Sequence, residues 1–295
     1  MRALTFLMLV GLLRADEQTQ KMTARLSEEA EAFRKIAVQV LATETLHQRA
    51  QKPPSRFHPR VGAAAAAPPP VEWKERHIVS EYGFASFGGS EAAVHELRQV
   101  ISVDGRKVAD TEKAQEDLAR TITASDDARK KEMLKQFEKY GLVGAVTDFG
   151  QLILLFTRRE LERYEFSMKS PQWLGGSRVL VFGYKQLDGP EALTVIEGNK
   201  NDRLRRLKIQ GEIWVRPETY LPVRITMAAH EGDAPASIRE EASVDYAMTP
   251  FGALMPTATE HRELRGGKIA AENRFTYTDF HKFGASSDVK FGVAK

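Results

Sequence analysis

The sequence predicts an α+β protein that is mainly antiparallel β: an open half-barrel meander of about nine to eleven strands, with helices packed on its concave side. Apolar and polar residues alternate with a period of two through most of the second half of the chain, which is typical of half-buried strands. Two other segments have helical spacing instead. The chain has 295 residues and no cysteine, so a buried core rather than disulfides must supply its stability.

Residues 1–15 have the pattern of a cleaved export signal. Arg2 supplies the charge, residues 3–13 are apolar, and Leu13-Arg14-Ala15 approximates a small-x-small cleavage site. An apolar run of this length falls short of the roughly 20 residues that span a bilayer. We expect a periplasmic or secreted protein that does not span the membrane after cleavage. A buried N-terminal strand and a retained anchor are the alternatives.

Residues 16–50 are expected to form an N-terminal helix and the first strand. The helix face repeats Leu26, Ala30, Phe33, Ile36, Ala37, Val40 and Leu41. Residues 51–72 form a Pro/Ala-rich segment, which predicts an exposed linker. The β-rich half-barrel then covers residues 73–285, and residues 286–295 are a C-terminal tail.

Residues 111–140 predict a helical insert that is broken near Thr123 to Asp127. Ser125 is the expected N-cap, with Asp126 and Asp127 favourable at the positive end of the helix dipole. The expected buried stripe of the second helix consists of Met133, Leu134 and Phe137.

Within the half-barrel, strands are predicted at residues 94–103, 163–168, 177–185, 211–216, 222–227, 238–248, 257–264 and 274–278. Asp104-Gly105 and Gly266-Gly267 suit tight hairpin turns. The strand at residues 177–185 is apolar on both faces, so we expect it to be covered on both sides. Trp214 alternates with inward residues and is expected on the convex face beside Arg216, partly exposed.

The inward positions define a candidate hydrophobic-ligand lining. They should converge on one side of the sheet and are Phe166, Phe182, Ile213, Val215, Val223, Ile225, Met227, Val244, Tyr246, Phe275 and Tyr277. Two outcomes are open. Either the helices fill the concavity completely, or an apolar tunnel under residues 133–140 accepts an acyl chain.

Composition and motifs indicate neither an enzyme nor a nucleic-acid binder. The net charge of +3 is small, and the basic cluster at residues 129–135 is expected to be a solvated helix face. The cluster at residues 203–208 is expected at a strand entry, with contact to anionic lipid or a partner as the alternative. No catalytic constellation and no cofactor motif is present. The histidines have no metal-ligand spacing, and His261 with Glu263 is expected to be exposed on a polar strand.

The chain resembles the LolA/LolB lipoprotein-carrier superfamily, which includes regulators of the RseB type. The resemblance is carried by Leu46-His47-Gln48 after the N-terminal helix, the hairpin at residues 211–224, and the closing pattern Phe275-x-Tyr277-x-Asp279-Phe280-x-x-Phe283. It implies an unclosed eleven-stranded barrel whose apolar concave face is covered by helices and accepts acyl chains. The arginine that controls ligand in the carriers has no match here, so no functional residue is carried over.

Two functions follow as hypotheses. The first is an exported, non-enzymatic protein of the bacterial cell envelope that binds or senses a lipid or a lipoprotein acyl chain. The alternative is an envelope assembly or interaction protein whose concave face is filled by its own helices and which binds another envelope protein. Neither requires a cofactor, a metal or nucleic acid.

Overall fold

The computed structural model describes residues 2–52, 71–88, 94–142, 148–187, 193–197, 203–230 and 238–283. Most of the expected linker, at residues 53–70, and the whole C-terminal tail lie outside the described residues. The side chains of residues 1–15 and of the basic cluster at 203–206 lie outside them as well.

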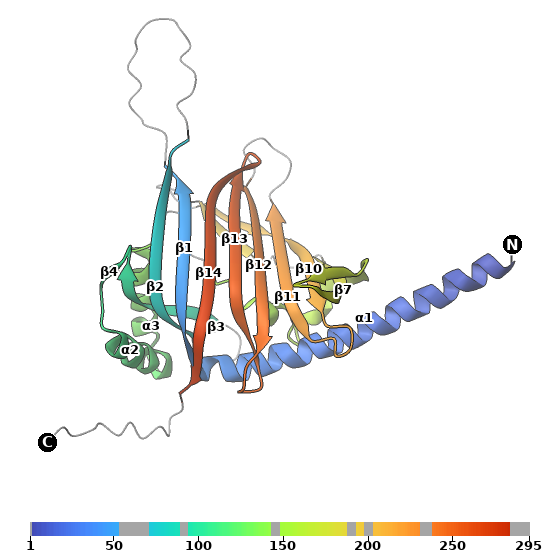
Figure 1. The fold of residues 1–295 in the computed structure, drawn as a ribbon, viewed down its shortest axis with the longest axis horizontal. Helices are drawn as coiled ribbons and strands as arrows, with labels where there is room; N and C mark the ends of the chain where they lie inside the picture. The colour runs from blue at the N-terminus through green and yellow to red at the C-terminus, as the bar shows by residue number, and fades with distance from the viewer. Residues whose placement is uncertain are drawn as a thin grey trace, which may run out of the picture.

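In the described residues, twelve strands form one antiparallel sheet in the order β4-β3-β2-β1-β14-β13-β12-β11-β10-β7-β5, with β6 beside β7 (Figure 1). The strands of this sheet are β1 (Val40–Gln51), β2 (Trp73–Ser86), β3 (Val94–Val103), β4 (Arg106–Lys107), β5 (Tyr164–Met168), β6 (Gln172–Leu174), β7 (Ser177–Gln186), β10 (Ile209–Val215), β11 (Pro222–His230), β12 (Ile238–Met248), β13 (Leu254–Arg265) and β14 (Lys268–Lys282). β8 (Leu193–Glu197) and β9 (Arg203–Leu207) pair with each other in a separate two-stranded sheet. The predicted antiparallel class is confirmed.

The strand order differs from a simple meander in two places. β1 pairs with β14, so the first and last strands meet near the middle of the sheet, and β10 pairs with β7 because β8 and β9 leave the sheet. Pairing the first strand with the last places β1 and β14 inside the sheet, so its edges are the short strands β4 and β5. The sheet has one strand more than the expected nine to eleven. No strand was predicted at β2, β4 or β6, and of these β4 and β6 are too short to give a clear sequence signal.

The sheet has an apolar and a polar face. The inner face carries Leu46, Ile213 and Val244, all below 1% exposed. The outer face carries His47 and Trp214. The indole of Trp214 is half-buried, and its Nε1 donates to Glu212 Oε2 at 3.0 Å. The expected convex position of Trp214 is therefore confirmed, although Arg224, at 5.6 Å from the ring, lies over it rather than Arg216.

Helix α1 (Arg2–Ile36) runs across the sheet, and its N-terminal part projects beyond it (Figure 1). Its buried stripe is Met22, Leu26, Ala30 and Phe33, and the Phe33 ring meets Phe84 of β2 edge to face at 5.1 Å. The prediction that this helix continues to Leu41 was wrong. It ends at Ile36, one 3-10 turn η1 (Ala37–Gln39) follows, and β1 begins at Val40, where β-branched residues favour a strand.

Helices α2 (Thr111–Thr123) and α3 (Asp127–Glu138) confirm the helical insert and its break. The N-cap of α3 is Asp126, which accepts from Ala128 N at 2.8 Å, rather than the expected Ser125. Leu118 and Ile122 of α2 pack with Leu41, Ala85, Leu97 and Met133 in a second hydrophobic cluster. Strand alternation from His47 places Leu41 on the outer face. The expected concave placement therefore holds for α1, whereas α2 covers the outer face.

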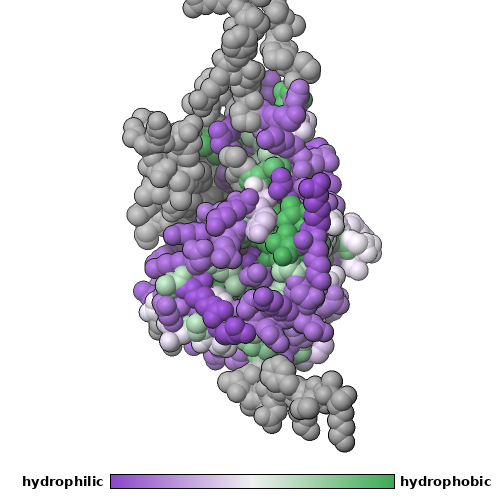
Figure 2. Space-filling model, turned by 90° about the vertical axis from the view of Figure 1, so that its left-hand side faces the viewer, coloured by the Kyte–Doolittle hydropathy of each residue, from purple (hydrophilic) through white to green (hydrophobic). Residues whose placement is uncertain are grey.

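Helix α3 lies at the β3 edge of the sheet. Its Met133 belongs to the outer cluster, while Phe137 belongs to the main core on the inner side. Seen from the β4 side, the surface is mainly hydrophilic and shows only a small hydrophobic patch (Figure 2).

The predicted turns are present. Asp104 and Gly105 have φ values of 50° and 75°, and Gly266 and Gly267 have 55° and 73°, as tight hairpin turns require. Pro256 was expected to precede its strand, but it lies inside β13, opposite Tyr246 at a register shift. A bulge of this kind accommodates a residue that has no N–H to donate.

Candidate functional site

The predicted lining residues come together on the inner face. Nine are buried in the main core, namely Phe182, Ile213, Val215, Ile225, Met227, Val244, Tyr246, Phe275 and Tyr277, and Phe166 packs against them half-buried. Val223 does not belong to this core. It is half-buried beside a register shift between β10 and β11, which interrupts the alternation that had placed it inward.

A short irregular segment fills the centre of this face. We call residues 148–156 the plug segment; it contains the 3-10 helix η2 (Leu152–Phe156). Its Phe149, Leu152, Ile153 and Phe156 are buried in the main core together with α1. Phe156 makes an edge-to-face contact with Tyr184 at 5.0 Å. The sequence analysis did not identify this segment, although the run Leu152-Ile153-Leu154-Leu155-Phe156 is a visible signal.

Side chains of the sheet hold the plug segment through its backbone. Gly150 N donates to Glu96 Oε1 at 2.6 Å, and Tyr246 Oη donates to Gly150 O at 2.9 Å. The same Tyr246 oxygen accepts from Ile153 N at 3.1 Å. Asp148, at the start of the segment, lies 2.9 Å from His95 Nδ1, and this hydrogen bond raises the pKa of His95. The plug segment is therefore anchored at three positions.

Glu96 belongs to a buried ionic network on β1 and β3. Arg98 Nε donates to Glu44 at 2.8 Å, and Arg98 Nη2 donates to Glu96. All three side chains are almost fully buried, and burial raises the pKa of Glu96 to about 7. The Arg98 guanidinium also lies 5.0 Å from the Phe137 ring. Beside it, Tyr82 Oη is buried and has no hydrogen-bond partner among the described residues.

A second polar chain crosses four strands of the inner face. Leu142 N donates to Gln48 Oε1, and Gln48 Nε2 donates to Asn273 Oδ1 at 2.7 Å. Asn273 Nδ2 then lies 3.0 Å from His261 Nδ1, and His261 Nε2 lies 2.6 Å from Glu240 Oε2. Because the first donor is a backbone N–H, the direction of each following bond is fixed, so His261 accepts at Nδ1 and donates from Nε2.

This chain corrects the expectation for His261 and Glu263. Both are buried, at 1% and 7% exposed, and the partner of His261 is Glu240 rather than Glu263. Strand alternation correctly placed both residues on the same face of β13. It did not show whether that face is buried or exposed, because this depends on how β13 pairs and packs in the folded protein. Among the described residues, no group of three or more histidine or acidic side chains is placed to hold a metal ion.

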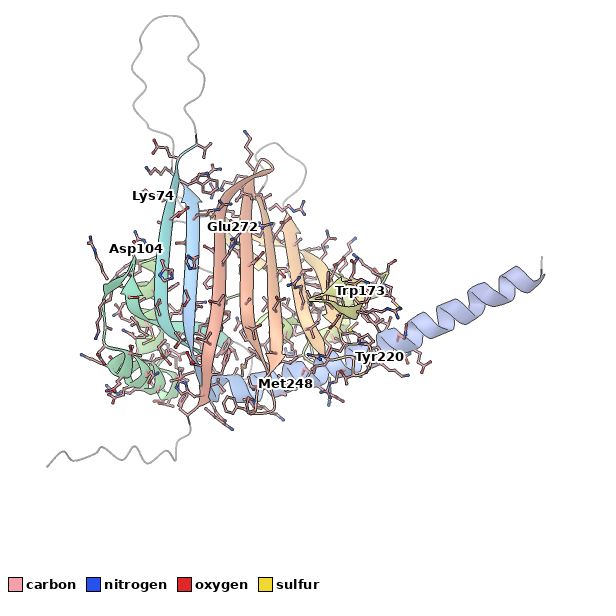
Figure 3. The ribbon with its side chains drawn as sticks, in the orientation of Figure 1. Lys74, Asp104, Trp173, Tyr220, Met248 and Glu272 are labelled. Carbon is pink, nitrogen blue, oxygen red and sulfur yellow. The ribbon has the colours of Figure 1, made fainter. Side chains whose placement is uncertain are left out.

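Two cavities open beside outer-face residues. A cavity of about 510 Å³ is lined by His47, Gln48, Arg49, Glu75, Arg76, His77, Asp104, Glu272 and Arg274, and Asp104 and Glu272 mark its position in Figure 3. A cavity of about 270 Å³ lies over β11, β12 and β13. Neither is the apolar tunnel expected beneath residues 133–140, where Phe137 packs on Arg98 instead.

No family model matches the chain, and no curated protein matches it. Among solved structures, the chain is similar to a domain named for outer membrane lipoprotein sorting from Vibrio parahaemolyticus, with 10% identity, a TM-score of 0.35, and 92% and 93% of the two chains covered. It is also similar to a DUF1329 family protein from Desulfovibrio piger, at 9% identity and TM-score 0.36, covering 89% and 92%.

A third similar structure is a LolA superfamily protein from Nitrosomonas europaea, at 10% identity and TM-score 0.36, covering 88% and 92%. This is the superfamily that the sequence itself resembles. At these identities and TM-scores the matches carry no argument about function. In the part of the chain that the structure describes, no helix is long and apolar enough to cross a membrane.

Proposed function

We propose that this is an exported, non-enzymatic binding protein of the bacterial cell envelope, which accepts an acyl chain on the inner face of its sheet. The acyl chain would take the place of the plug segment. The inner face would then bind either the protein's own plug segment or an acyl chain. In the described structure the plug segment occupies it.

The observation that carries this proposal is the nature of the plug segment. It inserts four buried apolar side chains into the core, yet it is a short 3-10 segment whose backbone is held by side chains of Glu96 and Tyr246 rather than by pairing with a strand. A segment anchored by a few hydrogen bonds can leave without breaking the sheet.

The energies of the two occupants are comparable. A sixteen-carbon chain gains on the order of 12 kcal/mol from about fifteen methylenes at 0.8 kcal/mol each. Removing four apolar side chains costs roughly 6–12 kcal/mol at 1.5–3 kcal/mol each. The difference between these terms is roughly 0–6 kcal/mol in favour of the acyl chain, so we expect affinity to rise steeply with chain length and to reach about tens of micromolar only for long chains.

Export is supported by the amino-terminal residues. The described core of α1 begins at Met22, and the N-terminal part of the helix projects beyond the sheet (Figure 1), so cleavage near Ala15 would leave the buried stripe intact. N-terminal sequencing of the protein from its native compartment should find a start near Asp16. A start at Met1 would remove the basis for a periplasmic or secreted location.

The binding proposal is tested with the purified native protein. Mass spectrometry of its organic extract should find an acyl compound, and a fluorescent acyl probe should bind saturably at micromolar concentration. Binding should strengthen as the chain of the probe is lengthened from eight to sixteen carbons. A folded protein that binds none of these probes would contradict the proposal.

A second function is favoured by the closed inner face. In the described residues the plug segment and α1 pack on the inner face, and a cavity lies beside outer-face residues such as Arg49, His77 and Arg274. In that case the protein binds an envelope partner through its surface. Absence of acyl binding, together with loss of a native complex in an Arg274→Glu variant, would support this function instead.

A further inference from the structure

Gly150 is held by two hydrogen bonds to buried side chains as well as by packing. Its N–H donates to a buried carboxylate, Glu96, and its carbonyl accepts from a buried hydroxyl, Tyr246. The inner face therefore presents one acceptor and one donor, spaced to bind an N–H and a C=O that are separated by a single carbon. The preceding residue, Phe149, places its ring 4.6 Å from His261, in the apolar part of the site.

The carbon between these two groups has no room for a branch. A Cβ on Gly150 would lie 2.6 Å from Glu96 Oε1, 2.7 Å from Tyr82 Oη and 3.2 Å from Pro256 Cγ. Glu96 is held by Arg98, and the Tyr82 ring packs 4.7 Å from Tyr277, so neither can move aside easily. The pocket around this carbon accepts a CH₂ group.

We propose that the site selects an N-acylated amino compound of the form acyl–NH–CH₂–C(=O)–, in which the plug segment is replaced by its chemical equivalent. This inference rests on the proposed function and names its ligand class. The amide N–H binds Glu96 and the second carbonyl binds Tyr246. The acyl chain begins where Phe149 lies now, because the acyl group is attached to the amide nitrogen.

The electrostatics of the site favour this class over other acyl compounds. When Glu96 is ionised its carboxylate has acceptors only and requires a donor from its ligand. Because burial raises the pKa of Glu96 to about 7, the comparison is made above about pH 8. An ester provides no donor and leaves a buried carboxylate oxygen without its partner. A free fatty acid brings a second negative charge beside Glu96 and Glu44, and Arg98 is already engaged by both.

The test uses three competitors of equal chain length against a fluorescent acyl probe, with the full-length mature protein. They are N-palmitoylglycinamide, its ester analogue palmitoyl glycolamide, in which oxygen replaces N–H, and N-palmitoyl-L-alaninamide, which adds one methyl group at the CH₂ carbon. We expect the glycinamide to bind at least ten-fold more tightly than either of the others, as loss of a hydrogen bond to a charged group and a steric overlap each predict.

Two variants separate recognition from folding. In Glu96→Gln the carboxamide can itself donate, so the preference for amide over ester should fall below three-fold. In Tyr246→Phe the donor to the shared carbonyl is lost for both compounds and for the plug segment alike, so the preference for amide over ester should remain. If Glu96→Gln does not fold, the three-compound comparison on the unmodified protein decides alone.

The outcomes distinguish this inference from the proposed function. Equal binding of the three competitors overturns the ligand class and leaves acyl binding in place. Failure of the probe and of every competitor to bind overturns both. Preference for the alaninamide would show that the site around Gly150 is not the one the ligand occupies.

Discussion

Replacing Gly150 with alanine should open the inner face. The new Cβ would lie 2.6 Å from Glu96 Oε1 and 2.7 Å from Tyr82 Oη, whereas ordinary contacts begin near 3.4 Å. The plug segment must therefore withdraw by about 0.8 Å, since the buried partners are held in place. The bond from Gly150 N to Glu96, now 2.6 Å, would lengthen to about 3.4 Å and be lost in effect.

The energy of this change follows from two contributions. A hydrogen bond to a charged group is worth about 1.5–3 kcal/mol, and overpacking costs about 1–3 kcal/mol. If the segment relaxes and avoids part of the overlap, the closed state loses about 2–4 kcal/mol. At 1.4 kcal/mol for each factor of ten, the apparent affinity for an acyl probe should rise at least 30-fold, until the open state predominates.

The assay is a titration of a fluorescent acyl probe, accompanied by hydrogen exchange of the plug segment. Gly83→Ala is the matched control, because its Cβ would lie 2.8 Å from Ile122 and 2.9 Å from Leu41 in the outer cluster. This control should lower the melting temperature without changing probe affinity. Equal probe affinities for the two folded variants and the unmodified protein would refute the role of the plug segment.

Three further predictions concern stability. Burial beneath α2 raises the pKa of Glu81 to about 7. The protonated form of Glu81 therefore stabilises the folded state fully below the ordinary pKa of 4.5, and this stabilisation is lost as the pH rises through 7. The free energy of unfolding should fall by up to about 3 kcal/mol between about pH 5 and pH 8, and urea titrations of Glu81→Gln should show a smaller fall. In Gly211→Ala the Cβ would lie 2.0 Å from a backbone oxygen of β11, so thermal unfolding should show a loss of roughly 3 kcal/mol or more; an unchanged melting temperature would mean that β10 and β11 pair differently. Arg98→Met leaves Glu44 and Glu96 buried without a cation and should cost about 3–5 kcal/mol at neutral pH in denaturant titrations; stability should recover in acid, where both carboxylates are protonated, and a loss independent of pH would contradict this account.

The alternation of residues along the chain was enough to place most strands and to assign their faces. A period of two cannot be satisfied by a helix, and shifting a strand by one residue would expose its whole apolar set. This is why Ile213, Ile225, Val244 and Phe275 lie together as predicted, and why Trp214 lies on the outer face. The hairpin turns followed from Asp104-Gly105 and Gly266-Gly267, because positive φ values restrict the residue type.

Which elements pack against those faces could be seen only in the tertiary structure. The pairing of β1 with β14 joins residues more than 200 positions apart, and no local pattern specifies such a contact. That pairing brings Gln48 to Asn273, and Asn273 lies against His261. The plug segment is likewise a non-local result: its five consecutive apolar residues have no strand or helix period, and their position depends on Glu96 and Tyr246, which come from strands far apart in the chain. Local propensity determined the elements, whereas long-range hydrogen bonding and burial determined the candidate site.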